Sequence, residues 1–407
     1  MRVLLAHKFF NITGGAEVFF HKVGDALTEN GHVVAKFASN NEGVEVDWSE
    51  LDREAHFVDY KNGSILEKGL RVPSIIYSKT NKERFKRMIS DFQPDIVHVF
   101  SIFTTVTPSI LDACSEMGVK VVMSCNDYKH ICPNYKLYHH GRICLECKGG
   151  KFYNAIKNKC CKDSVSFSLV SSLESYAHMY KNVVFGNVDR FMFSSEFMAS
   201  ITAEFLGDNQ FKYSILRNPF ESPKYEYSTI HEDYILYFGR LVEEKGVDVL
   251  LKAMSHLPQI KLKVVGNGPD EEKLLEIKQN LNLENVEFLG PKYNEELEPI
   301  LKACRFVVVP SLWHENYPYV INQSFAYGKA VIGSDKGGIP EMIRDGEFGY
   351  IYPAESIENL SNVINELYSD ESKYIGFGRR AKQWSDKNFN FITFYDNLIK
   401  IYEKVLR

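Results

Sequence analysis

Short apolar runs alternate with amphipathic stretches along most of the chain. Phe306 to Val309 is an uninterrupted apolar run that stops at Pro310, as expected of a parallel strand buried on both faces. A polar loop follows, and a helix should begin near Pro318, because proline suits the first helical turn. Ala330 to Gly333 predicts the next strand, and Gly337-Gly338 opens a second loop into a helix. Two helix N-termini should therefore face one carboxyl sheet edge, where open α/β sheets bind ligands and free N–H groups attract anions.

The same alternation fills both halves of the sequence. In the first half, β-rich runs predict strands at 2–6, 33–38, 96–100, 119–123 and 190–194, and helical patterns occupy 16–29, 82–90, 108–117 and the residues after 196. The pattern restarts with strands at 234–238, 261–265 and 286–289 and helices at 247–254, 271–280 and 294–303, and the chain after Tyr352 is predicted to be helical. Repeated β–α alternation predicts an α/β fold of Rossmann-like, doubly wound domains.

Length and linker composition divide the chain. A sequence of 407 residues is long for a single core, so two domains are expected. Leu216 to Pro219 and the polar stretch 221–232 resemble a linker. We therefore predict a first domain over 1–217, a second over 218–385, and a C-terminal helix over 386–407 that packs back towards the first domain. A cleft between two such domains is a usual place for a ligand.

The distribution of charge suggests particular partners only in two basic stretches of the chain. The net charge of −5 gives no reason to expect nucleic acid. Residues 61–90 nevertheless hold eight Lys/Arg, Lys61 among them, against two Glu, and residues 129–162 hold eight against Glu146 alone. A solvated basic face explains this most simply. The functional alternative is attraction to an anionic membrane surface or to a phosphate-bearing acceptor.

No segment predicts export or membrane insertion. The N-terminus has only four apolar residues between charges, too few for a signal peptide, and no apolar run approaches the roughly 18 residues of a spanning helix. We expect a cytoplasmic protein, with peripheral attachment to the inner face of a membrane as an open alternative.

Two cations follow the strand predicted at 234–238. Arg240 comes directly after the strand end, and Lys245 lies at the mouth of the next helix, beside Gly246. A guanidinium, an ammonium and helix-terminal amides together suit a diphosphate, since charge-assisted bonds contribute about 1.5–3 kcal/mol each. An ordinary pair of surface cations is the alternative. The loop Asn11 to Gly15, with Thr13 and Gly14, could likewise present amides to a phosphate, or could be a plain tight turn.

The ordered motifs together resemble a known family. Gly239 to Gly246, Val265 to Pro269, Phe288 to Gly290 and Pro310 to Gly349 occur in the order and near the spacing seen in the retaining glycosyltransferases of family four, and Asn11 to Glu17 is similar to that family's first glycine-rich loop. The resemblance implies the GT-B fold, in which two Rossmann-like domains face a cleft that holds a nucleotide sugar.

The resemblance also implies roles for individual residues. Arg240 and Lys245 would grip the donor diphosphate, and Glu315 would contact the donor sugar hydroxyls as the first acidic residue of the family's Glu-x7-Glu motif. Gly290 would approach the base. The other implied donor-binding positions are Gly15, Gly268, Asn316, Tyr317 and Gln323.

Two positions depart from the family pattern. The second acidic residue, which binds the ribose hydroxyls, is Gln323 here, and an amide accepts with one oxygen while its nitrogen donates. We expect altered nucleotide binding. Asn126 replaces a histidine that the family often has, and it cannot take a proton near neutral pH. Asp127 could orient a sugar or acceptor hydroxyl, whereas His98 is either a substitute base or, more simply, a structural histidine.

Six of the eight cysteines lie between 125 and 161. Cys144 and Cys147 form a C-x2-C pair, which with two distant thiolates can close a tetrahedral zinc site. Disulfides are disfavoured in the cytosol. We predict structural zinc at Cys132, Cys144, Cys147 and Cys160, in an insertion over about 125–162, and free thiols are the main alternative. Cys161 or one of His130, His139 and His140 could replace a ligand.

Together with these observations, the resemblance implies a retaining, metal-independent glycosyltransferase with Glu315, Arg240, Lys245 and Asp127 in catalysis. No cofactor is expected for the reaction itself. The partners would be a nucleoside diphosphate sugar and a glycan or lipid-linked acceptor. The alternatives are a catalytically silent nucleotide-sugar sensor or assembly subunit, or another GT-B enzyme such as a nucleotide-sugar epimerase.

Overall fold

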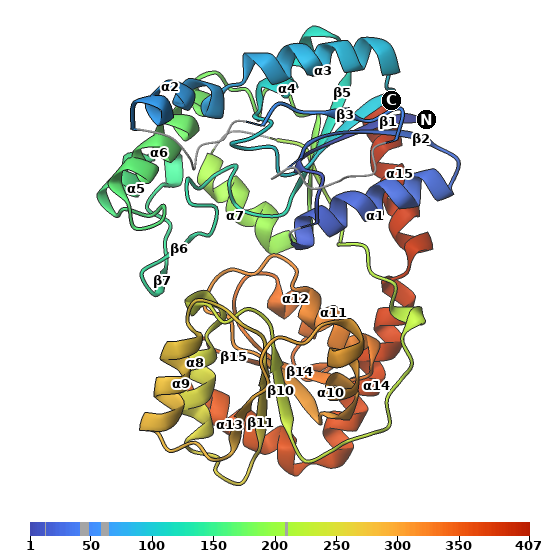
Figure 1. The fold of residues 1–407 in the computed structure, drawn as a ribbon. Coiled ribbons are helices and arrows are strands. Elements are labelled where there is room, and N and C mark those ends of the chain that lie inside the picture. The colour runs from blue at the N-terminus through green and yellow to red at the C-terminus, as the bar shows by residue number, and fades with distance from the viewer. Residues whose placement is uncertain (13, 41–48, 58–64, 208–210) are drawn as a thin grey trace. The chain divides into compact units, whose positions relative to one another are not determined.

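The computed structural model describes residues 1–12, 14–40, 49–57, 65–207 and 211–407. The chain divides into two compact units (Figure 1), the first made of Met1–Leu137, Cys144–Pro219 and Phe394–Arg407, the second of Tyr138–Ile143 and Phe220–Thr393. The main crossing, after Pro219, lies two residues beyond the boundary predicted from sequence. Thr13 of the glycine loop and Lys61 of the first basic stretch lie outside the described residues.

The first unit is built on a parallel sheet whose strands follow the order β3-β2-β1-β4-β5-β8-β9. The strands are β1 (Arg2–Phe9), β2 (Val33–Ser39), β3 (Arg53–Glu54), β4 (Ile96–Val99), β5 (Lys120–Cys125), β8 (Arg190–Phe193) and β9 (Tyr213–Ile215). The helices are α1 (Gly15–Glu29), α2 (Ile65–Ile76), α3 (Lys79–Phe92), α4 (Ser109–Glu116), α5 (Tyr153–Lys157), α6 (Val165–Tyr180), α7 (Glu196–Leu206) and α15 (Phe391–Leu406).

The second unit repeats this arrangement with the order β12-β11-β10-β13-β14-β15, again all parallel. Its strands are β10 (Ile235–Phe238), β11 (Leu262–Val265), β12 (Val286–Phe288), β13 (Phe306–Val309), β14 (Ala330–Ser334) and β15 (Gly349–Tyr352). Its helices are α8 (Val247–Met254), α9 (Glu271–Asn280), α10 (Leu297–Ala303), α11 (Tyr319–Ala326), α12 (Ile339–Ile343), α13 (Ile357–Ser369) and α14 (Glu371–Asn388).

Burial of both sheet faces explains why the strand sequences are apolar without alternation. All four residues of β13 are buried, and so are all four of β10 and of β4. A parallel sheet covered by helices on both sides has no polar face, so runs such as Phe306–Val309 fit only there. Both strand orders are those of doubly wound sheets, which confirms the predicted fold class.

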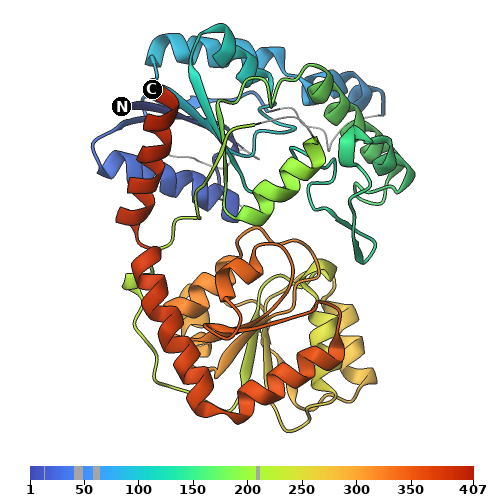
Figure 2. The ribbon, with the colours of Figure 1, turned by 180° about the vertical axis from the view of Figure 1, so that it is seen from behind.

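The C-terminal segment is two helices. Helix α14 ends at Asn388, and the backbone of Phe389 leaves the helical region at φ −120° and ψ 76°. From Phe394 the chain belongs to the first unit, where Figures 1 and 2 show α15 beside α1. Phe394 contacts Phe19 edge to face, and Leu398 and Tyr402 are fully buried in the core that the two helices share with β1 and β4.

The stretch 220–232 is packed against the second unit, although its polar composition suggested a linker. Phe220 is buried and stacks on Tyr225, and the Ser222 hydroxyl donates to Asp386 at 2.7 Å. The hydroxyl of Ser228 donates to the carbonyl of Lys302. Few of these contacts leave a hydrophobic pattern in the sequence, because they are single side chains bonded to distant helices.

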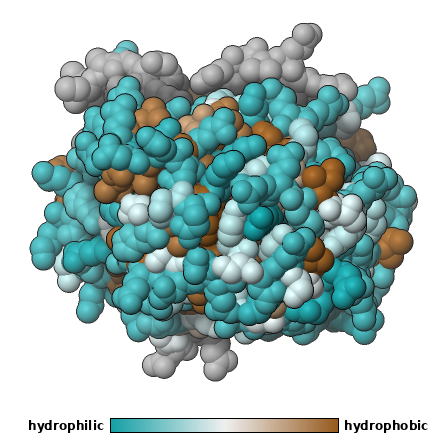
Figure 3. Space-filling model, turned by 90° about the horizontal axis from the view of Figure 1, so that it is seen from below, coloured by the Kyte–Doolittle hydropathy of each residue, from teal (hydrophilic) through white to brown (hydrophobic). Residues whose placement is uncertain are grey.

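In the described part of the chain, no helix is both long and apolar enough to cross a membrane. The face of the molecule drawn in Figure 3 is mostly hydrophilic, with apolar side chains in small separate groups.

Candidate functional site

The switch point of the second sheet lies between β10 and β13. These strands are neighbours, but the chain leaves β10 towards β11 on one side and leaves β13 towards β14 on the other. Open α/β sheets bind ligands beyond the carboxyl ends of two such strands. The segments that follow β10 and β13 begin at Gly239 and Pro310, and they carry the residues singled out from the sequence.

The segment after β10 is fixed by close backbone contacts. Its last turn, Glu243–Lys245, is a short 3-10 helix, and Gly246 follows with φ +67°. A Cβ atom on Gly246 would lie 2.0 Å from the carbonyl oxygen of Pro310, so only glycine permits this approach. The N–H of Leu312 also donates to the carbonyl of Glu244 at 2.9 Å. The two segments of the switch point are thus locked together.

Lys245 and Glu315 meet across this junction. The ammonium nitrogen of Lys245 lies 2.5 Å from Glu315 Oε1, and the Ser311 hydroxyl donates to the same oxygen at 2.8 Å. The Glu315 side chain is 6% exposed and that of Lys245 24%. Lys245 also lies 5.6 Å from the ring centroid of Trp313. A buried carboxylate is therefore presented at the strand end with a partly accessible ammonium beside it.

The loop after β14 holds the backbone of Glu315. The N–H of Gly338 donates to the Glu315 carbonyl at 2.7 Å, and a Cβ atom on Gly337 would lie 2.1 Å from that carbonyl oxygen. Ser334, at the end of β14, donates to the carbonyl of Ser311 at 2.6 Å. Sequence reasoning missed Ser311 and Gly337 as supports of Glu315. Their only signal was a hydroxyl and a glycine in the two loops at the same sheet edge.

Arg240 and the glycines of the β11 and β12 loops lie next to this junction. The Arg240 side chain is exposed and, in the described residues, has no hydrogen-bond or ion-pair partner. The loop after β11 packs on its backbone neighbours, since the N–H of Leu241 donates to Asn267 and a Cβ atom on Gly268 would lie 2.1 Å from the Leu241 carbonyl oxygen. Gly290 has φ +68° and open space where a Cβ would lie.

The predicted contacts on α11 and in the loop before it differ in accessibility. Tyr317 is buried against Phe389 in the core of the unit, so only its backbone could serve a ligand, and Asn316 beside it is half-buried. Gln323 is partly exposed, although Asn322 and Ser324 on either side are fully buried. Within the described chain the Gln323 amide has no hydrogen-bond partner.

The remaining predicted site residues lie in the first unit. Gly15, the last residue of the glycine loop, begins α1. Asp127 follows β5, and its carboxylate accepts the N–H of Lys129 at 2.9 Å. Burial raises the pKa of the Asp127 carboxyl, while this hydrogen bond and the nearby Lys8 oppose the rise. Asn126, its neighbour, is half-buried.

His98 is a structural residue in this fold. It is fully buried, its Nδ1 lies 2.7 Å from the Tyr402 hydroxyl on α15, and its Nε2 lies 2.8 Å from the Ser124 hydroxyl on β5. Burial lowers the pKa of His98 to about 3. With both nitrogens bonded and no exposed edge, this ring fits the structural alternative and not the substitute base.

A buried pair at the end of β1 was not foreseen. His7 and Glu17 are both buried, with His7 Nε2 3.9 Å from Glu17 Oε1, and a Cβ atom on Gly14 would lie 3.5 Å from the other Glu17 oxygen. Burial lowers the pKa of His7 to about 3, so the ring is neutral at physiological pH. The pair lies at the switch point of the first sheet, where β1 neighbours β4.

The four cysteines predicted to bind metal all belong to the first unit, but in the described chain no three of their sulfur atoms lie within 4.8 Å of one another. Burial, followed by the charges of Cys132, Cys144 and Cys160, raises the pKa of the Cys147 thiol. Burial also raises the pKa of Cys160 to about 12, and the charges of Cys144 and Cys132 add to that rise. Burial raises the pKa of the Cys132 thiol, and hydrogen bonding with the backbone of Leu137 and Asn134 opposes that rise. All eight cysteines of the described chain are free thiols.

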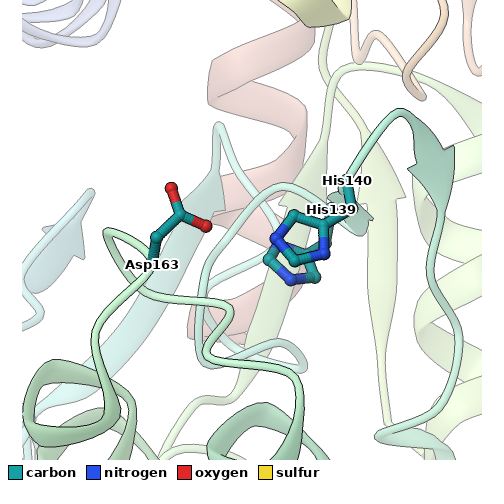
Figure 4. A group of neighbouring side chains, drawn as sticks. All are labelled: His139, His140 and Asp163. Atoms are coloured by element: carbon teal, nitrogen blue, oxygen red, sulfur yellow. The ribbon is translucent and has the colours of Figure 1, made fainter.

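Of the histidines weighed as substitute ligands, His139 and His140 belong to the other unit, and His130 is already bonded. His139 and His140 stack with 3.6 Å between ring centroids (Figure 4) in the hairpin of β6 (Tyr138–His139) and β7 (Arg142–Ile143), which belongs to the second unit. Asp163, drawn with them, belongs to the first. His130 lies 2.8 Å from the Thr202 hydroxyl.

Comparison with known proteins adds a family for part of the chain. Residues 227–384 match the family of glycosyl transferases, group 1. This segment contains Arg240, Lys245, Glu315 and Gln323, and therefore the whole switch point described above. A Klebsiella pneumoniae relative, described as an uncharacterized 42.6 kDa protein in the cps region, is 24% identical over 371 residues, which cover 88% of this chain and 91% of that protein.

Solved structures extend the likeness to both units. Sucrose-phosphate synthase from Thermosynechococcus elongatus has a TM-score of 0.72 at 16% identity, over 99% of this chain and 98% of its own. HepE of Anabaena, solved in complex with UDP, has a TM-score of 0.68 at 16% identity, over 99% of this chain and 100% of its own. At these identities the likeness concerns the fold, and it confirms GT-B with its two Rossmann-like domains.

Proposed function

We propose that this protein is a retaining glycosyltransferase that moves a sugar from a nucleoside diphosphate sugar to an acceptor hydroxyl. The observation that carries the proposal is the contact of Lys245 with Glu315 at the switch point of a glycosyl transferase group 1 segment. The Lys245 ammonium can bind an anion, and the Glu315 carboxylate can accept hydrogen bonds from sugar hydroxyls. HepE, with the same fold, binds UDP, which supports a nucleotide donor.

The chemistry required of the site is charge stabilisation. Lys245 and the exposed guanidinium of Arg240 would bind the donor diphosphate and stabilise the charge that develops as it leaves. Glu315, whose carboxylate is held by the Ser311 hydroxyl, would orient the donor sugar by accepting hydrogen bonds from its hydroxyls. In this proposal the departing phosphate takes the proton of the acceptor hydroxyl on the face that it leaves, which gives retention without a protein base. The two cations and the loop amides would bind the diphosphate and stabilise its charge, so the proposed reaction uses no metal ion.

The acceptor is proposed to be a surface polysaccharide or glycolipid intermediate. The Klebsiella relative in the cps region supports this assignment. Asp127, whose pKa is raised by burial, would orient the acceptor hydroxyl from the first unit.

A silent nucleotide-sugar sensor is the second candidate, because Gln323 and Asn126 replace residues that the resembled family uses. Incubation with a panel of nucleotide sugars, with and without membrane extracts as the acceptor source, separates the two. An enzyme releases nucleoside diphosphate, slowly even without acceptor. Binding without release under both conditions would favour the sensor, and an isomerised sugar nucleotide would favour an epimerase.

We also propose a structural zinc ion at Cys132, Cys144, Cys147 and Cys160. The support is the C-x2-C spacing of Cys144 and Cys147, together with the effect of neighbouring cysteine charges on the pKa of Cys132, Cys147 and Cys160. Zinc binding contributes apparent free energies of about 10–16 kcal/mol in small sites. Elemental analysis should find one zinc per chain in wild type and Cys161→Ser but not in Cys144→Ser. Absence of zinc, with all eight thiols titrating, would contradict the proposal.

A further inference from the structure

Helix α6 buries polar side chains and exposes apolar ones, the reverse of the usual arrangement. Its buried residues are polar, namely Ser168, Ser172, Glu174 and His178. Its exposed residues include large apolar side chains: Val165 (51% exposed), Leu169 (43%), Leu173 (47%) and Tyr180 (92%). Val165, Leu169 and Leu173 recur at every fourth position, which places them in one stripe along the helix, and Tyr180 continues it seven residues on.

The inversion is specified by the polar contacts beneath the helix. Glu174 lies 2.7 Å from the Lys129 ammonium, and the Ser172 hydroxyl donates to the Phe152 carbonyl at 2.9 Å. The Ser168 hydroxyl accepts the Cys161 N–H at 3.0 Å. Rotating the helix to bury its apolar stripe would leave these groups without partners, at a cost that the buried ion pair makes large. The exposed stripe is therefore a fixed feature of the fold.

The same packing continues at the far end of α6. His178 Nε2 lies 2.8 Å from the carbonyl oxygen of Ile76, the last residue of α2. Figure 1 shows α6 with α2 and α5 around it, which leaves the outer side of the helix uncovered by described elements.

Lysines are frequent in the chain segments next to α6. Residues 148–181 contain six Lys against only Asp163 and Glu174, and Glu174 is already paired with Lys129. Lys157, Lys159, Lys162 and Lys181 are exposed. Lys162 lies 4.5 Å from the ring centroid of Phe167, which itself is 43% exposed at the start of the helix. We define the α6 surface as Val165, Leu169, Leu173 and Tyr180 together with these four lysines.

We propose that the α6 surface docks the protein on an anionic lipid bilayer. Apolar side chains on one helix face enter the boundary between headgroups and acyl chains, and lysines beside them bind the negative headgroups. A second copy of this chain fits the charge less well, since a two-fold contact through the stripe would bring the lysines of both copies together.

Vesicle sedimentation with the full chain tests this directly. Wild type should bind phosphatidylcholine vesicles that contain phosphatidylglycerol at least about tenfold more tightly than vesicles of phosphatidylcholine alone. The double variant Leu169→Ser/Leu173→Ser and the double variant Lys157→Gln/Lys159→Gln should each lower that binding about tenfold. The control Leu275→Ser, on exposed α9 of the second unit, should bind like wild type.

Thermal unfolding of the variants provides the check on folding, because substitutions at exposed positions should leave the melting temperature unchanged. Wild type that fails to bind anionic vesicles would overturn the proposal, and so would folded stripe variants that bind like wild type. Concentration-dependent dimers that disappear in the stripe variants, without vesicle binding, would assign the surface to a second copy. None of these measurements uses sugar transfer, so they are independent of the proposed activity.

Discussion

The ammonium of Lys245 lies 2.5 Å from Glu315 Oε1 at the carboxyl ends of β10 and β13. Without a ligand the two charges satisfy each other, and Ser311 completes the coordination of the carboxylate. A diphosphate would compete with Glu315 for the ammonium. The contact therefore places a cation and a carboxylate within reach of one ligand, and their contributions to binding and turnover can be measured separately.

Glu315→Gln should affect nucleotide binding and turnover in opposite directions. Removing the carboxylate frees Lys245 and removes repulsion of the diphosphate, so UDP affinity should rise a few-fold, whereas turnover of the sugar donor should fall by about a hundredfold or more. Calorimetric titration of UDP and an assay of nucleoside diphosphate release measure the two effects. Glu287→Gln, at an exposed position of β12, is the control. Loss of UDP affinity in Glu315→Gln would contradict this account of the pair.

Gln323→Glu should raise nucleotide affinity, because a carboxylate accepts two ribose hydroxyls where the amide oxygen accepts less strongly. The gain should be about three- to tenfold for UDP and should vanish for 2′,3′-dideoxy-UDP, which lacks those hydroxyls. Gln279→Glu, exposed on α9, adds the same charge elsewhere on the unit. Equal affinities of wild type and Gln323→Glu would show that this position does not face the ribose.

Gly246→Ala should damage the site far more than Gly346→Ala. Both glycines have positive φ, at +67° and +75°, but an added Cβ at 246 would lie 2.0 Å from the Pro310 carbonyl oxygen, whereas the one at 346 would meet nothing within 4 Å. The strained backbone alone costs about 1–2 kcal/mol. Urea unfolding should show about that loss for Gly346→Ala and a larger one for Gly246→Ala, with weakened UDP binding. Similar losses of stability in both variants would mean that the two loops move apart to fit the added methyl group at little cost in free energy.

The stability of the first unit should fall as the pH falls from 6.5 towards 3. His98 is neutral when folded, with its pKa lowered to about 3, but it binds a proton near pH 6.5 when unfolded. Between these values the unfolded state holds more protons, so its stability relative to the folded state rises by about 1.4 kcal/mol per pH unit of acidification. His98→Gln, which can still form hydrogen bonds with Ser124 and Tyr402, removes this pH-dependent contribution to the free energy of unfolding. The difference in unfolding free energy between wild type and His98→Gln should therefore shrink on acidification, and a difference independent of pH would refute the assignment.

Periodicity in the sequence was most informative where the chain alternates between buried strands and amphipathic helices. Helices 247–254 and 271–280 have the predicted bounds, and β13 lies where its apolar run placed it. The apolar stripe of α6 could not be placed this way, since the same spacing on an ordinary helix would face the core. Its orientation depends on Lys129 and Phe152, which are distant in sequence.

The site was predictable to the level of its segments but not of its supports. Arg240, Lys245 and Glu315 lie at strand ends as their positions after apolar runs indicated. The contact of Gly246 with Pro310 depends on how two loops pack, which no local pattern encodes. Residues 220–232 show the converse, because their polar sequence hid a packed segment.

The release of nucleoside diphosphate from a nucleotide-sugar donor, compared among wild type, Lys245→Ala, Arg240→Ala and Lys278→Ala, tests the central claim most directly. If the switch point of the second unit holds the donor diphosphate, the first two variants should lose about a hundredfold or more in turnover, whereas Lys278→Ala on α9 should match wild type. Equal and small effects of all three substitutions would show that the diphosphate is not bound there.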